Sequence, residues 1–195
     1  DKNRSRRSGR NGAMTMTFEK MQIDPYNERI LKLCRRYAKR FGTMLADNRS
    51  LLFWGNVGTG KSCAAFAIAN HLIKDGFTVQ ICTLSELLEQ QYPADRAKPS
   101  GNEETAPPDL FIIDEINGVN APENALYGVC SFIEERNRLR LPMIFITSLT
   151  LAEMQRTPDE VHHRLYSAIL STAYPLQFTG KNRHLADHSI KNADN

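Results

Sequence analysis

A glycine-rich segment, GNVGTGKS at residues 55–62, carries residue types and spacing suited to binding phosphate. Gly55, Gly58 and Gly60 permit backbone turns that larger residues avoid, so successive N–H groups can point at one anion. Lys61 adds a mobile positive charge, and the Ser62 hydroxyl is a ligand for Mg²⁺. The pattern predicts a site for a nucleoside triphosphate and Mg²⁺. We expect the nucleotide to be bound by Gly55, Asn56, Val57, Gly58, Thr59, Gly60, Lys61, Ser62 and Cys63.

Two adjacent acids, Asp114 and Glu115, follow the apolar run LFII at residues 110–113. A run of this length is typical of a strand that is buried on both faces. Hydrolysis of a nucleoside triphosphate needs a group that holds the cation and a group that orients the attacking water. Asp114 is predicted to hold Mg²⁺ and Glu115 to activate the water. The alternative is that both are surface acids that end a core strand.

Three further residues are candidates for the γ-phosphate side of this site. Ser148 follows the apolar run at residues 143–147 and is either a hydrogen-bonding partner of the attacking water or a simple turn residue. Arg164 and Arg183 are candidates for neutralising charge on the γ phosphate, although the position of each, taken alone, favours an ordinary surface arginine. His162 and His163 lack acid or Cys partners at ligand spacing, which favours a helix surface over a metal site.

Alternating strands and helices must position these residues. The apolar patterns predict strands at residues 51–54, 77–83, 110–113, 143–147 and 174–178. They predict helices at residues 26–45, 61–73, 84–91, 122–141, 151–155 and 158–171. The helix at 26–45 has a basic face opposite one apolar stripe, which comprises Ile30, Leu33, Cys34, Tyr37, Ala38, Phe41 and Leu45. This order indicates an α/β fold of the P-loop NTPase type, in which a parallel β-sheet is sandwiched between helices and binds its ligand at the carboxyl ends of the strands.

The 195 residues, 41% of them hydrophobic, suit one domain with a tail at each end. We expect a basic disordered arm or linker at residues 1–15, a nucleotide-binding domain at 16–184, a polar tail at 185–195 and a surface loop at 93–108. The arm either helps to hold a phosphate backbone or is a solvated linker, and the net charge of +3 is too small to decide. Four scattered cysteines, no signal peptide and no membrane-length apolar run predict a cytoplasmic protein with reduced thiols.

From Thr17 to Arg183 the chain resembles the AAA+ ATPases of the DnaC and DnaI helicase-loader group, which also includes the IstB transposition ATPases. TFEKM resembles the family's opening segment, GNVGTGKS its Walker A motif, LFIIDEI its Walker B motif and ITSLTLAEM its sensor 1 strand. EVHHRL resembles the arginine-finger segment and FTGKNR the sensor 2 segment. The resemblance implies that Arg164 reaches the nucleotide of an adjacent subunit and that Arg183 contacts its own.

The resemblance further implies an ATP-dependent loader of the replicative DNA helicase that binds single-stranded DNA and forms a ring or spiral. One departure is Ser148, because the family usually has Asn at this sensor 1 position, and the shorter side chain predicts slower hydrolysis. The family's helicase-binding N-terminal domain has no counterpart in these residues, which begin with Asp rather than Met. Alternatives are an IstB-like regulator of transposition, an ATP-binding adaptor that does not hydrolyse, and a small-molecule kinase.

Overall fold

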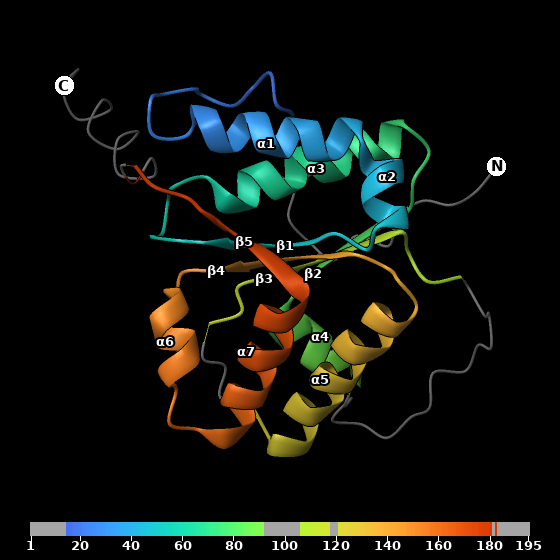
Figure 1. Cartoon of the computed structure of the whole chain (residues 1–195), viewed down its shortest axis with the longest axis vertical. Coiled ribbons are helices and arrows are strands. Elements are labelled where there is room, and N and C mark those ends of the chain that lie inside the picture. The colour runs from blue at the N-terminus through green and yellow to red at the C-terminus, as the bar shows by residue number, and fades with distance from the viewer. Residues whose placement is uncertain (1–14, 92–105, 118–120, 181, 183–195) are drawn as a thin grey trace, which may run out of the picture.

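The protein, described here from a computed structural model, has one parallel β-sheet that separates two layers of helices (Figure 1). The structure describes residues 15–91, 106–117, 121–180 and 182. Within them the strand order is β2-β3-β4-β1-β5, and every paired strand is parallel to its neighbour. The strands are β1 (Ser50–Trp54), β2 (Val79–Thr83), β3 (Leu110–Asp114), β4 (Met143–Thr147) and β5 (Ala173–Gln177). This sheet confirms the predicted fold class.

The helices divide between the two faces of the sheet, as the predicted alternation requires. They are α1 (Glu28–Lys39), α2 (Phe41–Ala46), α3 (Lys61–Lys74), α4 (Leu84–Gln91), α5 (Glu123–Arg138), α6 (Leu151–Arg156) and α7 (Glu160–Thr172). Figure 1 shows α1, α2 and α3 on one side and α4, α5, α6 and α7 on the other. Apart from the helix predicted at residues 26–45, the predicted elements therefore recur in the predicted order, with ends that differ by a few residues.

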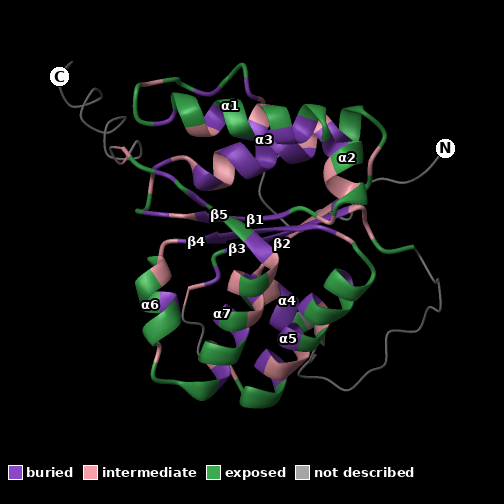
Figure 2. Cartoon of the chain, viewed as in Figure 1, coloured by how far each residue is buried: buried purple, intermediate pink, exposed green. Residues whose placement is uncertain are grey.

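The central strands are buried on both faces because helices cover each side of the sheet. Every residue of β3 and of β4 is buried, and Figure 2 shows the sheet as a buried layer between helices with exposed outer faces. Alternate side chains serve opposite layers. Leu51 and Phe53 pack with the α1 and α3 side chains, whereas Leu52 packs with those of α5 and α7. The continuous apolar runs in the sequence have this double burial as their cause.

The prediction of a single helix at residues 26–45 is wrong, because the structure has two helices that are separated at Arg40. Arg40 has φ −112° and ψ 24°, outside helical geometry, and Phe41 then begins α2. The predicted apolar stripe is also wrong in one member: Leu33 is 40% exposed, and Leu31 is buried in its place. Because α1 packs mainly on the single helix α3, its buried face is narrower than the sequence pattern suggested.

Arg136 is a buried cation that ties α5 to the chain around the start of β3. Its Nη2 donates to the Pro108 carbonyl at 2.9 Å and to the Pro142 carbonyl at 3.3 Å, and its guanidinium lies 5.4 Å from the centre of the Phe111 ring. Arg136→Ala should lower the free energy of unfolding by about 2 to 3 kcal/mol, because two carbonyls lose their donor and a buried ring loses its contact. Chemical denaturation measures this loss.

Arg138→Ala is the matched control, since Arg138 lies on the same helix but is exposed and, within the described part of the chain, pairs with Glu135 on the helix surface. Its effect should stay within about 0.5 kcal/mol. Equal losses in the two variants would show that Arg136 has no special structural role.

Several predicted features lie outside the described residues. These are residues 1–14 of the basic arm, residues 93–105 of the predicted loop and the polar tail. Among the described residues, no helix is long and apolar enough to cross a membrane. The four cysteines are free: Cys34, Cys82 and Cys130 are buried, and Cys63 is partly exposed.

Candidate nucleotide-binding site

The loop from residue 55 to residue 60 joins β1 to α3 in the conformation that its glycines predict. Gly55, Gly58 and Gly60 have φ angles of 129°, 78° and 95°, which residues with a side chain rarely adopt. Gly60 is also the N-cap of α3, so Lys61 and Ser62 lie in the first helical turn. The loop therefore presents backbone N–H groups and a helix N-terminus to an anion.

Lys61 is buried at the base of this loop and is held by the loop itself. Its Nζ donates to the carbonyl of Gly55 at 2.5 Å and to that of Asn56 at 2.7 Å. Burial lowers the pKa of Lys61, and the nearby Asp114 carboxylate opposes this shift. A poorly hydrated ammonium is stabilised further by an anionic partner, so its position suits the phosphates of a nucleotide.

The rest of the loop is braced from two directions. The Thr59 hydroxyl donates to the Asn56 carbonyl at 2.8 Å, whereas Val57 is 63% exposed. The segment after β5 crosses the loop: a Cβ at Gly55 would lie 2.2 Å from the Phe178 carbonyl oxygen, and a Cβ at Gly58 would meet Asn182. Asn182 precedes Arg183, which itself lies outside the described residues.

Gly55→Ala should lower the free energy of unfolding by about 2 to 4 kcal/mol, because the new methyl group would meet a backbone oxygen in a strained conformation. Urea denaturation measures this loss, and nucleotide affinity should fall with it.

Substitutions at two other glycines distinguish the cost of backbone strain from the cost of steric crowding at Gly55. Gly76 has φ 90° and Gly42 lies within α2, and a Cβ at either would have open space. Gly76→Ala should cost about 1 to 2 kcal/mol from strain alone. Gly42→Ala should stabilise the protein by about 0.5 to 1 kcal/mol. A loss at Gly55 no larger than that at Gly76 would contradict the crowding argument.

The acid pair lies beside the first turn of α3. Asp114 ends β3 and is 3% exposed, and its Oδ1 accepts from the Ser62 hydroxyl at 3.3 Å. The same oxygen accepts from the backbone N–H of Glu115 at 2.9 Å. Glu115 is exposed and has φ 58°, an uncommon angle for a residue with a side chain. The structure thus brings together the three residues predicted for Mg²⁺ and water activation.

These oxygens fit a magnesium ion. A hydroxyl and a carboxylate are hard donors, and Mg²⁺ is usually bound by one or two protein ligands while phosphates and water complete its coordination. No group of three or more His, Cys, Asp or Glu residues that could hold a metal occurs in the described part of the chain. Ser62 and Asp114 would therefore hold the ion only together with a nucleotide, which is the usual arrangement at a phosphate-binding loop.

Ser148 lies one residue beyond β4, the strand between β1 and β3. This order places Ser148 between the phosphate loop and the acid pair, because parallel strands end at the same edge of the sheet. Its backbone N–H donates to the Asn117 side-chain oxygen at 3.0 Å. The same oxygen accepts from the Thr147 hydroxyl, also at 3.0 Å. Sequence reasoning missed Asn117, although its position two residues after Glu115 was a usable signal.

The described contacts of Arg164 are with residues of α5 and not with its own phosphate loop. This arginine lies on α7, is roughly half exposed, and contacts two α5 residues: its guanidinium is 3.7 Å from the Glu134 carboxylate and 5.3 Å from the Tyr127 ring centre. His162 contacts the Asp159 carboxylate at 2.6 Å, where Asp159 caps α7. In the structure His162 therefore belongs to a helix start, whereas Arg164 is presented at the surface.

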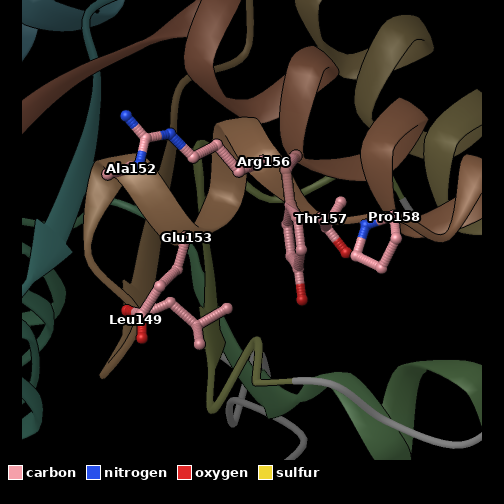
Figure 3. A pocket seen from close by; sticks show the side chains of 7 residues that line it. Leu149, Ala152, Glu153, Arg156, Thr157 and Pro158 are labelled. Atoms are coloured by element: carbon pink, nitrogen blue, oxygen red, sulfur yellow. The ribbon is translucent and has the colours of Figure 1, made fainter.

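A separate pocket of about 430 Å³ lies beside α6 and the start of α7. Figure 3 shows Leu149 and Glu153 on one side of it and Thr157 and Pro158 on the other. The Glu153 carboxylate is already engaged, because it accepts from the backbone N–H and the hydroxyl of Thr150 in a capping box. This pocket contains none of the predicted site residues.

Residues 51–171 match the family described as "ATPase family associated with various cellular activities (AAA)". This chain belongs to the AAA family. Its Walker A segment follows β1 and its Walker B segment comprises β3, two strands of one parallel sheet that are separated by β4. The resemblance inferred from its motifs is confirmed.

Two curated relatives show the nature of the similarity. Over 109 residues the chain is 34% identical to the replicative helicase loader DnaC of Buchnera aphidicola subsp. Schizaphis graminum, covering 53% of this chain and 43% of that protein. Over 149 residues it is 25% identical to the replicative helicase loader DnaC of Escherichia coli K12, covering 74% of this chain and 60% of that protein. The chain thus spans about half the length of these relatives.

Solved structures have the same fold. The DnaI structure superposes with a TM-score of 0.68 at 18% identity and covers 90% of this chain and 94% of its own. The DnaC helicase loader structure gives 0.70 at 16% identity, with coverage of 87% and 100%. At these identities the superpositions establish only that the fold is shared.

Proposed function

We propose that this protein is an ATP-dependent loader of a replicative DNA helicase, which binds and hydrolyses ATP with Mg²⁺ and binds single-stranded DNA. The observation that carries the proposal is the convergence of the Ser62 hydroxyl and the Asp114 carboxylate, 3.3 Å apart, at the mouth of the glycine loop. The names of the DnaC relatives support the helicase as the partner. The ATPase domain proposed here comprises residues 16–184.

Each residue of the site has a role in this proposal. The loop amides and Lys61 would bind the phosphates, and Ser62 and Asp114 would hold Mg²⁺, which would supply positive charge to neutralise the phosphates. Glu115 orients the attacking water, and Ser148 lies near it at the end of β4. Arg183, which follows the described Asn182 in the sequence, would contact the nucleotide of its own subunit.

The exposed position of Arg164 supports a role between subunits. Its described contacts lie on α5 rather than on its own loop, and about half of its side chain is exposed to solvent. An adjacent subunit in a homo-oligomeric ring or spiral would receive this arginine at its γ phosphate. Each active site would then be completed by an arginine from the neighbouring copy.

Affinity capture of the full-length protein with ATP and Mg²⁺ tests the partner. We expect the replicative helicase to be retained, and we expect a Lys61→Ala variant to retain much less of it. Recovery of a transposase without a helicase would overturn the loader function and favour the IstB-like alternative. Retention of the helicase equally by both proteins would contradict its dependence on ATP.

Phosphate release with and without single-stranded DNA tests the enzymatic part of the proposal. We expect turnover above background and a change when DNA is added, with DNA affinity falling as salt increases. Background turnover under both conditions would favour the adaptor, which Ser148 at the sensor 1 position motivates. Transfer of the phosphoryl group to a small acceptor would instead favour a kinase.

A further inference from the structure

Asn117 connects the segment that carries the acid pair after β3 to the segment that carries Ser148 after β4, although no motif includes it. The chain leaves β3 at Asp114 and turns through Glu115, whose φ of 58° is unfavourable for a residue with a side chain. Immediately afterwards the Ile116 N–H donates to the Ile146 carbonyl of β4 at 3.0 Å. The Asn117 side chain then accepts two hydrogen bonds from the end of β4.

The Asn117 carboxamide oxygen is well suited to this position. An amide oxygen accepts two hydrogen bonds, and here it takes one from the Thr147 hydroxyl and one from the Ser148 N–H, each at 3.0 Å. The Thr147 hydroxyl is itself fixed, because it also accepts from the Leu149 N–H at 3.1 Å, and Thr147 is 1% exposed. The Thr147 hydroxyl is therefore held in place, and its hydrogen bond orients the Asn117 side chain.

The strained residue thus has an anchor on each side. Before it, the Asp114 carboxylate accepts from the Glu115 N–H at 2.9 Å. After it, Ile116 is 1% exposed and Asn117 is bonded to β4. Loss of either anchor would let the backbone of Glu115 relax toward an ordinary conformation and move its carboxylate.

We propose that Asn117 is a positioning residue for ATP hydrolysis, which holds Glu115 in its strained conformation by tying the following chain to Thr147 and Ser148. This inference rests on the proposed ATPase function and deepens it. A connection between the two segments would also make the position of Ser148 depend on that of Glu115. The short Ser148 side chain should then impair hydrolysis less, because the Asn117 carboxamide, which follows β3 in the chain, is already hydrogen-bonded to the Ser148 N–H.

Asn117→Ala should lower kcat for ATP hydrolysis by about 10- to 100-fold, the effect expected when a catalytic group is displaced by about 1 Å. The Kd for ATP with Mg²⁺ should change less than about threefold, because the phosphate loop is untouched. Steady-state phosphate release and binding of a fluorescent ATP analogue measure the two quantities. A kcat within twofold of the unmodified protein, or an affinity that falls in parallel with kcat, would overturn the proposal.

Thr147 offers a matched pair of variants. Thr147→Ser keeps the hydroxyl and should retain nearly the original kcat, whereas the isosteric Thr147→Val removes the donor and should lower it. In the Asn117→Ala, Thr147→Val double variant the two losses should not add, since both remove the same bond. Full additivity would show that the two residues act independently and would contradict the proposed connection.

Amide hydrogen exchange of the nucleotide-free protein provides a readout that does not depend on turnover. In Asn117→Ala the Ser148 N–H loses its acceptor, so exchange in residues 143–149 should accelerate while that in α3 should not. Unchanged exchange would overturn the inference even if activity falls. Background turnover of the unmodified protein is a different result, which would refute the proposed hydrolysis itself and with it any role of Asn117 in that reaction.

Discussion

Glu115→Gln should hydrolyse ATP about 10²- to 10⁴-fold more slowly than the unmodified protein, the range expected when a general base is lost. The amide keeps the size of the side chain but cannot accept a proton from water. Glu115 is exposed just beyond the end of β3, and it is the backbone N–H of Glu115 that donates to the Asp114 carboxylate. We therefore expect nucleotide affinity and thermal stability to change little. Phosphate release and analogue binding measure both parts of this expectation.

Glu135→Gln is the control for this substitution, because Glu135 is exposed on α5 and pairs only with Arg138 in the described contacts. It should leave turnover unchanged. If Glu115→Gln also leaves turnover unchanged, Glu115 is not the base. If the unmodified protein has no turnover above background, the protein is an adaptor that binds ATP without using it.

Arg164→Ala should lower turnover by about 10³-fold or more if the arginine neutralises charge on the γ phosphate of an adjacent subunit. The variant should still bind ATP, because its own phosphate loop and Lys61 are intact. Loss of the Glu134 and Tyr127 contacts should have little effect on stability, since the ion pair is exposed at 3.7 Å. Turnover and analogue affinity are the two measurements.

Mixing inactive variants shows whether the arginine acts between copies. A Lys61→Ala subunit retains Arg164, and an Arg164→Ala subunit retains Lys61, so some interfaces in a mixed oligomer contain one complete site. We expect partial recovery of turnover in the mixture. The Arg138→Ala variant, an exposed arginine on α5, should be fully active alone. No recovery, combined with inactivity of each variant, would place Arg164 within its own site or outside the reaction.

The chemistry of the site was predictable because its signals are local. A glycine loop with Lys61 and Ser62 must adopt positive φ angles to form, and an acid after a buried apolar run must lie at the end of a strand. Helix and strand order followed from periodicity for the same reason. These inferences needed only neighbours in the sequence, and the AAA family match agrees with them.

The division of residues 26–45 into α1 and α2 could not be predicted in this way. The apolar positions continue through Phe41, so the pattern reads as one helix, whereas the structure ends α1 before Arg40 and buries Phe41 in the same core cluster as the α1 and α3 side chains. The pattern also did not show that Leu31 rather than Leu33 is buried. Periodicity identifies an apolar side of a helix, but the neighbouring element determines how wide the buried part is.

Local patterns were sufficient to predict a phosphate loop, a strand followed by two acids and an alternating α/β fold. The position of β4 between β1 and β3, which brings Ser148 between the loop and the acids, became known from the folded chain. The tertiary structure also shows that Asn117 bonds to Thr147 and Ser148, some 30 residues later in the chain. Strand order and side-chain pairing are long-range properties that depend on how distant segments pack, and local patterns contain no record of them.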